Sequence, residues 1–238
     1  MSARIDTAMV LAAGHGTRMR PLTDRRPKAL VEVAGKALID HAIDRLETAG
    51  MTSIVVNVHA FADMLRAHLA ARADPAIVIS DESDALLDTG GAIKRALPLL
   101  GEGPVITHNC DSLWVEGMGS SLDRLIAAWD PDRMDALLLV AVTATVIGDV
   151  ERGDFTMDAA GVLSWREPRS VAPFMFTGVQ IVKPRLWGDI AGQAFPTARV
   201  WRRLVDAGRA YGLRHDGVWM HVGTPQALAE AEAFLRAL

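Results

Sequence analysis

The fold is decided by the stretch Thr7-Ala-Met-Val-Leu-Ala12-Ala13-Gly14-His-Gly16-Thr17-Arg18-Met-Arg-Pro21-Leu-Thr-Asp-Arg-Arg-Pro27-Lys28. Its apolar beginning, residues 7–12, is typical of a buried strand. The polar segment that follows holds two glycines and several cations. Glycine adopts backbone angles closed to other residues and lets main-chain N–H groups approach an anion. The stretch therefore predicts a strand followed by an anion-binding loop.

Strand-like and helix-like segments alternate beyond this loop. The sequence predicts strands over residues 53–57, 76–80, 105–109 and 136–143, and helices over residues 38–49, 60–73, 91–99 and 122–129. The first helix is expected to stop at Gly50, because glycine is favoured at helix ends. Repeated strand–helix units of this length imply a mostly parallel sheet with helices on both faces. The fold class is therefore expected to be α/β.

The pattern changes after Gly148. A hairpin is predicted over residues 154–157 and 162–165, and further strands over 174–182 and 219–222. Thr224 can cap a closing helix and Pro225 suits its first turn. Because no repeat, low-complexity tract or linker interrupts the chain, we expect one continuous domain over residues 1–238, with an irregular last third.

Composition narrows the class of protein. Half of the 238 residues are apolar, which allows a sizeable core without disulfides. Cys110 is the single cysteine, as suits a reducing cytoplasm. The net charge of −4 gives no general attraction to nucleic acid. No apolar run has membrane-spanning length, and Asp6 interrupts the only short one before Val10, so neither a membrane span nor a signal peptide is expected.

The glycine loop differs from two better-known phosphate loops. A dinucleotide-binding loop needs a third glycine where this chain has Met19, and a Walker loop needs a Gly-Lys-Ser/Thr that is missing here. Small Ala12 and Ala13 leave space for a flat base, while Arg18 and Lys28 offer charge to phosphates. The alternative is an ordinary glycine-containing connection between two elements. The many arginine and lysine residues beside the two glycines make this alternative less favoured.

Two later segments bear on the same site. Asp88 and Thr89 precede a predicted helix, where they can cap it or contact a ligand. Asp111 follows the predicted strand 105–109, and ligands of open α/β sheets bind beyond the carboxyl ends of strands. A hard cation such as Mg²⁺ prefers carboxylate, water and phosphate oxygens. A turn cap is the alternative role for Asp111.

Residues 11–23 and 27–30 together resemble the signature loop of the sugar-1-phosphate nucleotidyltransferases, the NDP-sugar pyrophosphorylase family. The resemblance implies a Rossmann-like three-layer α/β/α sandwich with a mixed, mostly parallel sheet, the nucleotide-diphospho-sugar transferase fold. It also implies condensation of an NTP with a sugar 1-phosphate and release of pyrophosphate. Residues 1–147 would then form the nucleotide-binding part and residues 148–238 the sugar-binding part.

The resemblance assigns the site residues. Arg18 would bind the leaving pyrophosphate, Lys28 a phosphate, and Asp111 the Mg²⁺ cofactor, with Mn²⁺ as an alternative. The nucleotide would be bound by Ala12, Ala13, Gly14, Gly16, Thr17, Thr89, Gly90 and Asn109. The sugar would be bound by Asp154, Glu167 and Gly178, with Arg166 or Arg169 in place of the usual lysine.

Shorter stretches favour one branch of the family. Residues 57–60, 152–155, 176–179 and 219–225 resemble the uridylyltransferases that act on N-acetylmuramic acid 1-phosphate in cell-wall recycling. The resemblance predicts a cytoplasmic enzyme, a monomer or small homo-oligomer, whose partners are an NTP, UTP foremost, and a sugar 1-phosphate. No nucleic acid or membrane is expected as a partner.

His221 departs from the family, which carries at this position the Asp that is its second metal ligand. Histidine is a softer nitrogen donor and ligates Mg²⁺ poorly. His221 could contact phosphate, could favour Mn²⁺, or could mark a catalytically silent nucleotide-sugar sensor; a packed core histidine is a fourth possibility. A cytidylyltransferase or guanylyltransferase for another phosphorylated acceptor, such as choline phosphate, is the alternative within the fold.

Overall fold

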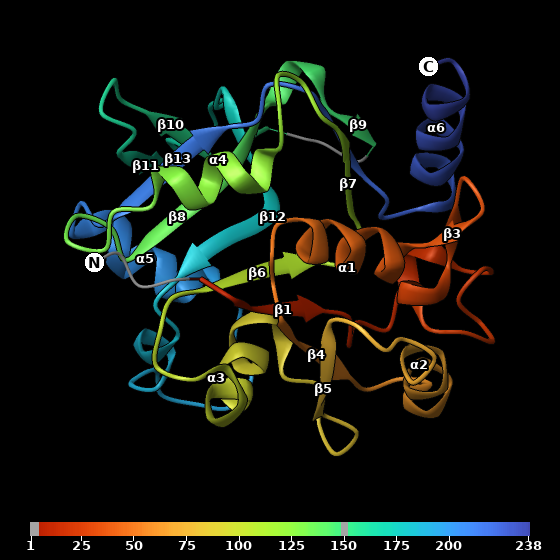
Figure 1. The fold of residues 1–238 in the computed structure, drawn as a ribbon. Coiled ribbons are helices and arrows are strands. Elements are labelled where there is room, and N and C mark those ends of the chain that lie inside the picture. Colours follow the sequence, from red (N-terminus) through yellow and green to blue (C-terminus); the bar gives the residue numbers. More distant parts are fainter. Residues whose placement is uncertain (1–4, 149–151) are drawn as a thin grey trace.

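A computed structural model describes residues 5–148 and 152–238 (Figure 1). Residues 1–4, part of the N-terminal stretch in which no signal peptide is expected, lie outside the described residues. No described helix has the length and apolar character needed to cross a membrane.

A parallel core is formed by the strands predicted in the first half of the chain. Its order is β6-β1-β4-β5, and the strands are β1 (Thr7–Leu11), β4 (Ser53–Val58), β5 (Ala76–Asp81) and β6 (Val105–Asn109). Parallel strands buried on both faces are rich in Val and Ile, as these are. The carboxyl ends of all four strands consequently meet at one edge of the sheet.

The sheet continues past β6 with antiparallel pairs. Strand β12 (Phe174–Val182) runs antiparallel to both β6 and β8 (Ala136–Val142), and β13 (Ala210–Arg214) is parallel to β8. The predicted hairpin forms β10 (Phe155–Met157) and β11 (Leu163–Trp165). Within residues 5–148 and 152–238 this sheet has nine strands, and the expected mixed, mostly parallel α/β architecture is confirmed.

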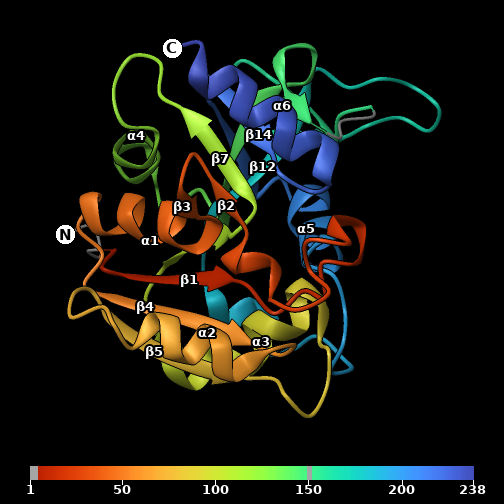
Figure 2. The ribbon, with the colours of Figure 1, turned by 90° about the vertical axis from the view of Figure 1, so that its right-hand side faces the viewer.

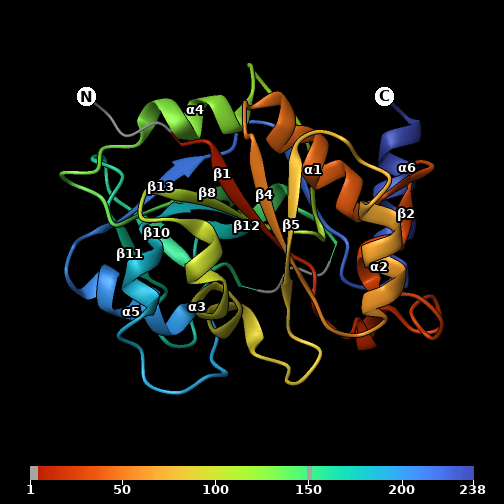
Figure 3. The same cartoon turned by 60° about the horizontal axis from the view of Figure 1, so that its bottom comes forward.

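Helices cover both faces of this sheet (Figures 1 and 3). Side chains of α1 (Leu38–Thr48), α2 (Ala62–Leu69) and α4 (Ser121–Ala128) share one core with Ala8 and Val10. Side chains of α3 (Asp88–Leu100) and α5 (Ala198–Asp206) share the opposite core with Met9. Successive residues of β1 thus face opposite layers, as strand geometry requires.

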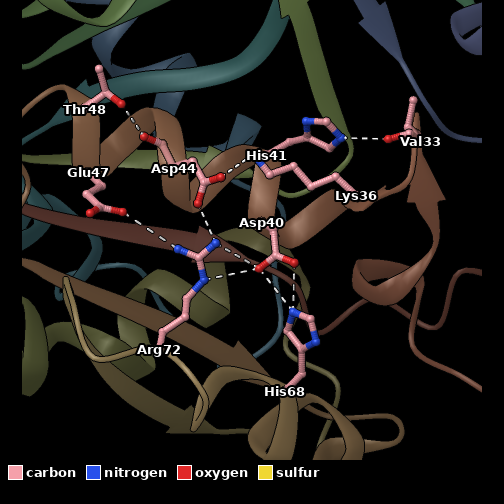
Figure 4. A network of polar contacts seen from close by, with 9 residues as sticks. All are labelled: Val33, Lys36, Asp40, His41, Asp44, Glu47, Thr48, His68 and Arg72. Atoms are coloured by element: carbon pink, nitrogen blue, oxygen red, sulfur yellow. Dashed lines mark hydrogen bonds and ion pairs between the residues drawn. The ribbon is translucent and has the colours of Figure 1, made fainter.

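Helix α1 illustrates why these segments become helical. Its buried residues Ile39, Ala42, Ile43 and Leu46 recur at helical spacing, and the chain turns at Gly50, whose φ is 85°. On its outer side the guanidinium of Arg72 binds Asp40 and Asp44, beside His68 (Figure 4). This polar network ties α1 to the segment that follows α2.

Several boundaries differ from the predicted ones. Helix α2 is shorter than predicted and begins after Phe61, whose φ of 53° is left-handed. Helix α3 begins at Asp88 rather than Gly91, because the Phe195 carbonyl accepts the amides of Gly90 (2.9 Å) and Gly91 (3.0 Å). Those amides lie in the first turn, where no intrahelical acceptor exists.

A second, smaller sheet was not predicted from the sequence. Its order is β7-β14-β9, from β7 (Ser112–Val115), β9 (Ile147–Gly148) and β14 (Val218–His221), with helix α6 (Pro225–Arg236) packed beside it (Figure 2). The sequence also did not predict several other described elements. These are helix α5, strand β13, a short hairpin of β2 (Glu32–Val33) and β3 (Lys36–Ala37), and four 3₁₀ turns.

Thr224 caps α6 as predicted, since its Oγ1 accepts the Ala227 amide at 3.2 Å. The proposed division between residues 147 and 148 falls inside β9, and residues 149–151 lie outside the described part of the chain. Strand β12 from the second part lies between β6 and β8 of the first, so the two parts share one sheet.

Candidate active site

A cavity of about 420 Å³ opens at the carboxyl ends of β1, β4 and β6. It is the place where open α/β sheets bind ligands. The three predicted catalytic residues Arg18, Lys28 and Asp111 all line it. It is also lined by seven of the eight predicted nucleotide-binding residues, namely Ala12, Ala13, Gly14, Gly16, Thr17, Thr89 and Asn109.

The glycine loop folds back onto Lys28. Gly16 has a φ of 63°, and a Cβ at this residue would lie 2.9 Å from the Cβ of Lys28. The Thr23 hydroxyl donates to the Gly16 carbonyl at 2.8 Å and holds the turn. Only glycine combines this backbone angle with so close an approach. Arg18 follows directly in the 3₁₀ turn Thr17–Met19, on the exposed side of the loop.

Asp111 lies between two nitrogen bases. Its Oδ2 is 2.5 Å from Lys28 Nζ and 3.4 Å from His221 Nε2. Burial raises the pKa of Asp111, but the charges and hydrogen bonds of Lys28 and His221 outweigh this and hold it well below its usual range. Asp111 is therefore an ionised carboxylate, and the partners of its Oδ2 are the side chains of Lys28 and His221.

The protein groups around Asp111 can hold a hard cation only if oxygens of the substrate complete the set of ligands. The described residues contain no group of three or more His, Cys, Asp or Glu side chains placed to hold a metal ion. Mg²⁺ is commonly bound through one or two carboxylates together with substrate phosphates and water. One carboxylate beside an anion-binding loop fits that arrangement. His221 faces the same carboxylate and stacks on Trp219, with ring centroids 5.9 Å apart.

Two further polar residues of the cavity were missed as site residues. The Ala12 amide donates to Asn57 Oδ1 at 2.6 Å, and Asn57 Nδ2 donates to Glu82 Oε1 at 2.9 Å. Glu82 is only 1% exposed, and burial raises its pKa. Asn57 is the last residue but one of β4, and Glu82 directly follows the neighbouring strand β5. The sequence signal that could have found Glu82 is an acidic residue directly after a buried strand.

Other predicted residues do not reach this cavity. Gly90 packs against Phe195, where a Cβ would lie 2.6 Å from the phenyl ring. Gly178, with a φ of 86°, packs against Asn109 instead. Among the described residues, neither of these glycines lines the cavity. Their assignments as nucleotide and sugar ligands stay predictions.

The remaining predicted sugar residues lie in the second half of the sheet. Asp154 Oδ2 accepts the Phe176 amide at 2.9 Å, and burial raises its pKa. Glu167 is exposed on a turn closed by Ser170. The Arg166 guanidinium donates to backbone carbonyls of Gly153 (3.1 Å) and Ser170 (3.2 Å). The Arg166 amide also donates to the Asp154 carbonyl at 2.9 Å, so these two residues are neighbours, whereas none of the contacts named here involves the Glu167 carboxylate.

Cys110 and His108 are core residues. The thiol of Cys110 is 5% exposed, and burial raises its pKa to about 12. The ring of His108 is fully buried and stacks on Trp114 with centroids 5.4 Å apart, and burial lowers its pKa to about 4. Both residues therefore stay uncharged at neutral pH.

Known proteins are similar to this chain in sequence and in fold. Residues 8–151 match the family described as MobA-like NTP transferase domain. The chain is 52% identical over 239 residues to N-acetylmuramate alpha-1-phosphate uridylyltransferase of Caulobacter vibrioides, which covers 99% of both chains. It is 37% identical to the protein of that name from Neisseria meningitidis serogroup B, over 95% of this chain and 96% of the relative.

A solved structure of UDP-glucose pyrophosphorylase complexed with UDP-glucose shares the fold. It superposes with a TM-score of 0.77 over 99% of this chain and 100% of that chain, at 16% identity. The family match spans more than half of the chain, and the Caulobacter relative matches nearly all of it. The protein therefore belongs to the MobA-like NTP transferase family and is a nucleotidyltransferase.

Proposed function

We propose that the protein is a uridylyltransferase that joins UTP to N-acetylmuramic acid 1-phosphate, giving the UDP-sugar and pyrophosphate. One observation carries the reaction class: the glycine loop, Arg18, Lys28 and Asp111 line a single cavity. The names of the Caulobacter and Neisseria relatives support the choice of base and sugar.

The chemistry requires in-line attack of a sugar-phosphate oxygen on the α-phosphorus. The bond from that phosphorus to the bridging oxygen of the β-phosphate breaks, and pyrophosphate leaves with the electron pair. The attacking phosphate is already ionised near pH 7, so positioning and charge neutralisation carry the step without a general base.

The glycine loop, Arg18, Lys28 and Asp111 each have a defined task in this scheme. The main-chain amides of residues 14–17 hold the triphosphate, and Arg18 and Lys28 stabilise the charge that develops on pyrophosphate. Asp111 would hold the divalent ion, Mg²⁺ or Mn²⁺, which neutralises phosphate charge when bound. Lys28 rests on Asp111 at 2.5 Å, within the same cavity as the loop.

His221 is proposed to act at this centre rather than to mark a silent relative. Its Nε2 lies 3.4 Å from Asp111 Oδ2, so it can donate to phosphate or serve a softer ion such as Mn²⁺. The His221→Asp variant tests this: we expect a higher ratio of Mg²⁺-supported to Mn²⁺-supported turnover. An unchanged ratio would contradict a metal-related role.

The second half of the chain, residues 148–238, is proposed to bind the sugar, with Asp154, Glu167 and Gly178 as candidates and Arg166 or Arg169 as the cation. We place the enzyme in the cytoplasm as a monomer or small homo-oligomer, without nucleic-acid or membrane partners. The single buried thiol of Cys110 supports a reducing compartment.

Pyrophosphate release measured over a panel of substrates tests the proposal. UTP, dTTP, GTP and CTP are each combined with N-acetylmuramic acid 1-phosphate, hexose 1-phosphates and choline phosphate, in Mg²⁺ and in Mn²⁺. We expect the highest kcat/KM for UTP with N-acetylmuramic acid 1-phosphate. Preference for CTP with choline phosphate would identify a cytidylyltransferase instead. Nucleotide binding without turnover in any combination would identify a silent sensor.

A matched pair of variants isolates the role of Asp111. Asp111→Asn should abolish turnover while part of the UTP binding persists, because the glycine loop and Arg18 are untouched. Glu102→Gln removes an exposed carboxylate away from the cavity and should leave turnover unchanged. Full activity of Asp111→Asn would refute the assignment.

A further inference from the structure

Glu82 is a buried carboxyl group of the cavity that the phosphate chemistry does not use. It is 1% exposed and lines the cavity at the carboxyl end of β5. Its backbone is held on both sides: its amide donates to the Val58 carbonyl at 2.9 Å, and its carbonyl contacts His59 Nδ1 at 2.6 Å. A group held this firmly is suited to recognising a ligand atom.

Its place in the sheet separates Glu82 from the phosphate end of the site. Asp111 follows β6 and Glu82 follows β5, and the order β6-β1-β4-β5 puts two strands between them. Three inter-strand steps span about 14 Å. That leaves room for a ribose and part of a base between the two carboxylates. Small Ala12 and Ala13 line the wall of the cavity between them.

The hydrogen-bond direction at Glu82 is set by the backbone. The Ala12 amide can only donate, so it fixes Asn57 with Oδ1 toward Ala12, at 2.6 Å. Asn57 must then present its Nδ2 donor to Glu82 Oε1, at 2.9 Å. The rest of the ionised carboxyl group can only accept. The cavity therefore offers an acceptor, oriented through Asn57, at its base end.

We propose that Glu82, positioned by Asn57, selects the nucleobase by accepting the N3–H of uracil, a proton that cytosine lacks at N3. Uracil carries a proton on N3, whereas cytosine has a lone pair there. A base N–H gives the carboxylate a charge-assisted hydrogen bond. A cytosine bound in the same pose would place its N3 lone pair against the carboxylate oxygen, which would then gain no donor from N3.

This inference rests on the proposed function and names how that site chooses its base. A site built to hydrogen-bond a substrate N–H rejects the analogue that lacks it by factors of up to about 10⁴. For this open cavity we expect wild-type kcat/KM for UTP to exceed that for CTP by at least about 100-fold. The raised pKa of Glu82, caused by burial and opposed by Asn57, agrees with a carboxylate that gains from a further donor.

The first experiment is the Glu82→Gln variant. Since Asn57 can only donate to position 82, the new glutamine must turn its oxygen toward Asn57 and its NH₂ toward the cavity. A donor then faces the base, which suits cytosine N3 and repels uracil N3–H. We expect the UTP/CTP ratio of kcat/KM to fall by at least about 100-fold. The ratio of the UTP to the CTP dissociation constant, measured by calorimetry without acceptor, should rise by a comparable factor.

A double variant tests the coupling between the two side chains. Asn57→Asp combined with Glu82→Gln exchanges the carboxylate and the amide between the two positions at constant size. The new carboxylate at position 57 still accepts the Ala12 amide but can no longer donate. The glutamine at position 82 therefore turns its NH₂ to that carboxylate and its oxygen to the base. We expect preference for UTP to return, whereas a merely structural role of these residues predicts no such return.

The control is Asp84→Asn, which alters an exposed carboxylate paired with Arg95 and should keep the wild-type ratio. Circular dichroism establishes that each variant is folded. Equal binding of UTP and CTP by the wild type, or one ratio shared by the single and double variants, would overturn the inference. Selective UTP binding by the wild type without any turnover would instead refute the proposed function and leave the inference standing.

Discussion

Replacing Gly178 by alanine should disturb both stability and the site. Gly178 lies where the register of β12 against β8 shifts, between Phe176 and Gln180, and it has a φ of 86°. An added Cβ would lie 2.9 Å from Asn109 Cβ and 3.1 Å from its Nδ2. Asn109 is the last residue of β6 and lines the cavity.

Two costs add at this position. A left-handed backbone costs an L-residue about 1–2 kcal/mol. Forcing a methyl group into a packed interior costs about 1–3 kcal/mol more. We therefore expect Gly178→Ala to lower the free energy of unfolding by about 3 kcal/mol. For a chain of this size that corresponds to a fall in Tm of roughly 6–12 °C.

Gly119 provides the matched control. Its φ is 89°, but a Cβ there would meet no atom within 4 Å. Gly119→Ala therefore carries only the backbone cost, about 1 kcal/mol. Urea unfolding compares the two variants, and the difference between them isolates the contact with Asn109.

The same substitution should affect the reaction, because Asn109 must shift to make room. We expect Gly178→Ala to reduce kcat/KM for UTP about tenfold at a temperature where it is fully folded, whereas Gly119→Ala keeps the wild-type value. If the two variants unfold within about 0.5 kcal/mol of each other and both turn over normally, the packing argument is wrong.

Three further measurements bear on the structure. Cys110, whose thiol pKa burial raises to about 12, should resist thiol reagents at pH 8 in the folded protein and react quickly in urea. Arg72→Met should cost about 1 kcal/mol of unfolding free energy at pH 7. Burial raises the pKa of Asp44, but hydrogen bonds from Lys36 and Arg72 outweigh this and lower the pKa below its ordinary value of 3.8. The ion pair therefore stabilises the folded protein fully above pH 3.8, and this stabilisation should be lost as the pH falls through the lowered pKa of the folded state. Thr224→Ala should cost about 1 kcal/mol by removing the cap of α6, whereas Thr224→Ser should cost much less.

Local patterns were enough to predict most of the fold. The strands of the parallel core and β12 were predicted because apolar runs of strand length stand between turn residues. The glycine loop was recognisable because its residues are contiguous. The family, the α/β architecture and the nucleotidyltransferase class, all expected from that loop, are confirmed.

The unpredicted parts depend on partners far along the chain. Strand β7 has only four residues and pairs with β14, more than a hundred residues later. Glu82 and Asn57 meet because β4 and β5 are neighbours in register, with Asn57 opposite Ser80. Sequence spacing does not reveal such neighbours. Helix α5 is different, because its buried apolar residues Val200, Trp201 and Leu204 recur at helical spacing. The sequence itself therefore contains a signal for this helix.

Gly223 closes one side of the cavity, while the glycine loop near the beginning of the chain forms another. A ribosome makes the glycine loop long before it makes Gly223. A growing chain therefore has no complete cavity until β14 and Gly223 have emerged. A nucleotide that binds this cavity can therefore stabilise only the completely folded protein, because binding shifts the folding equilibrium toward the folded state.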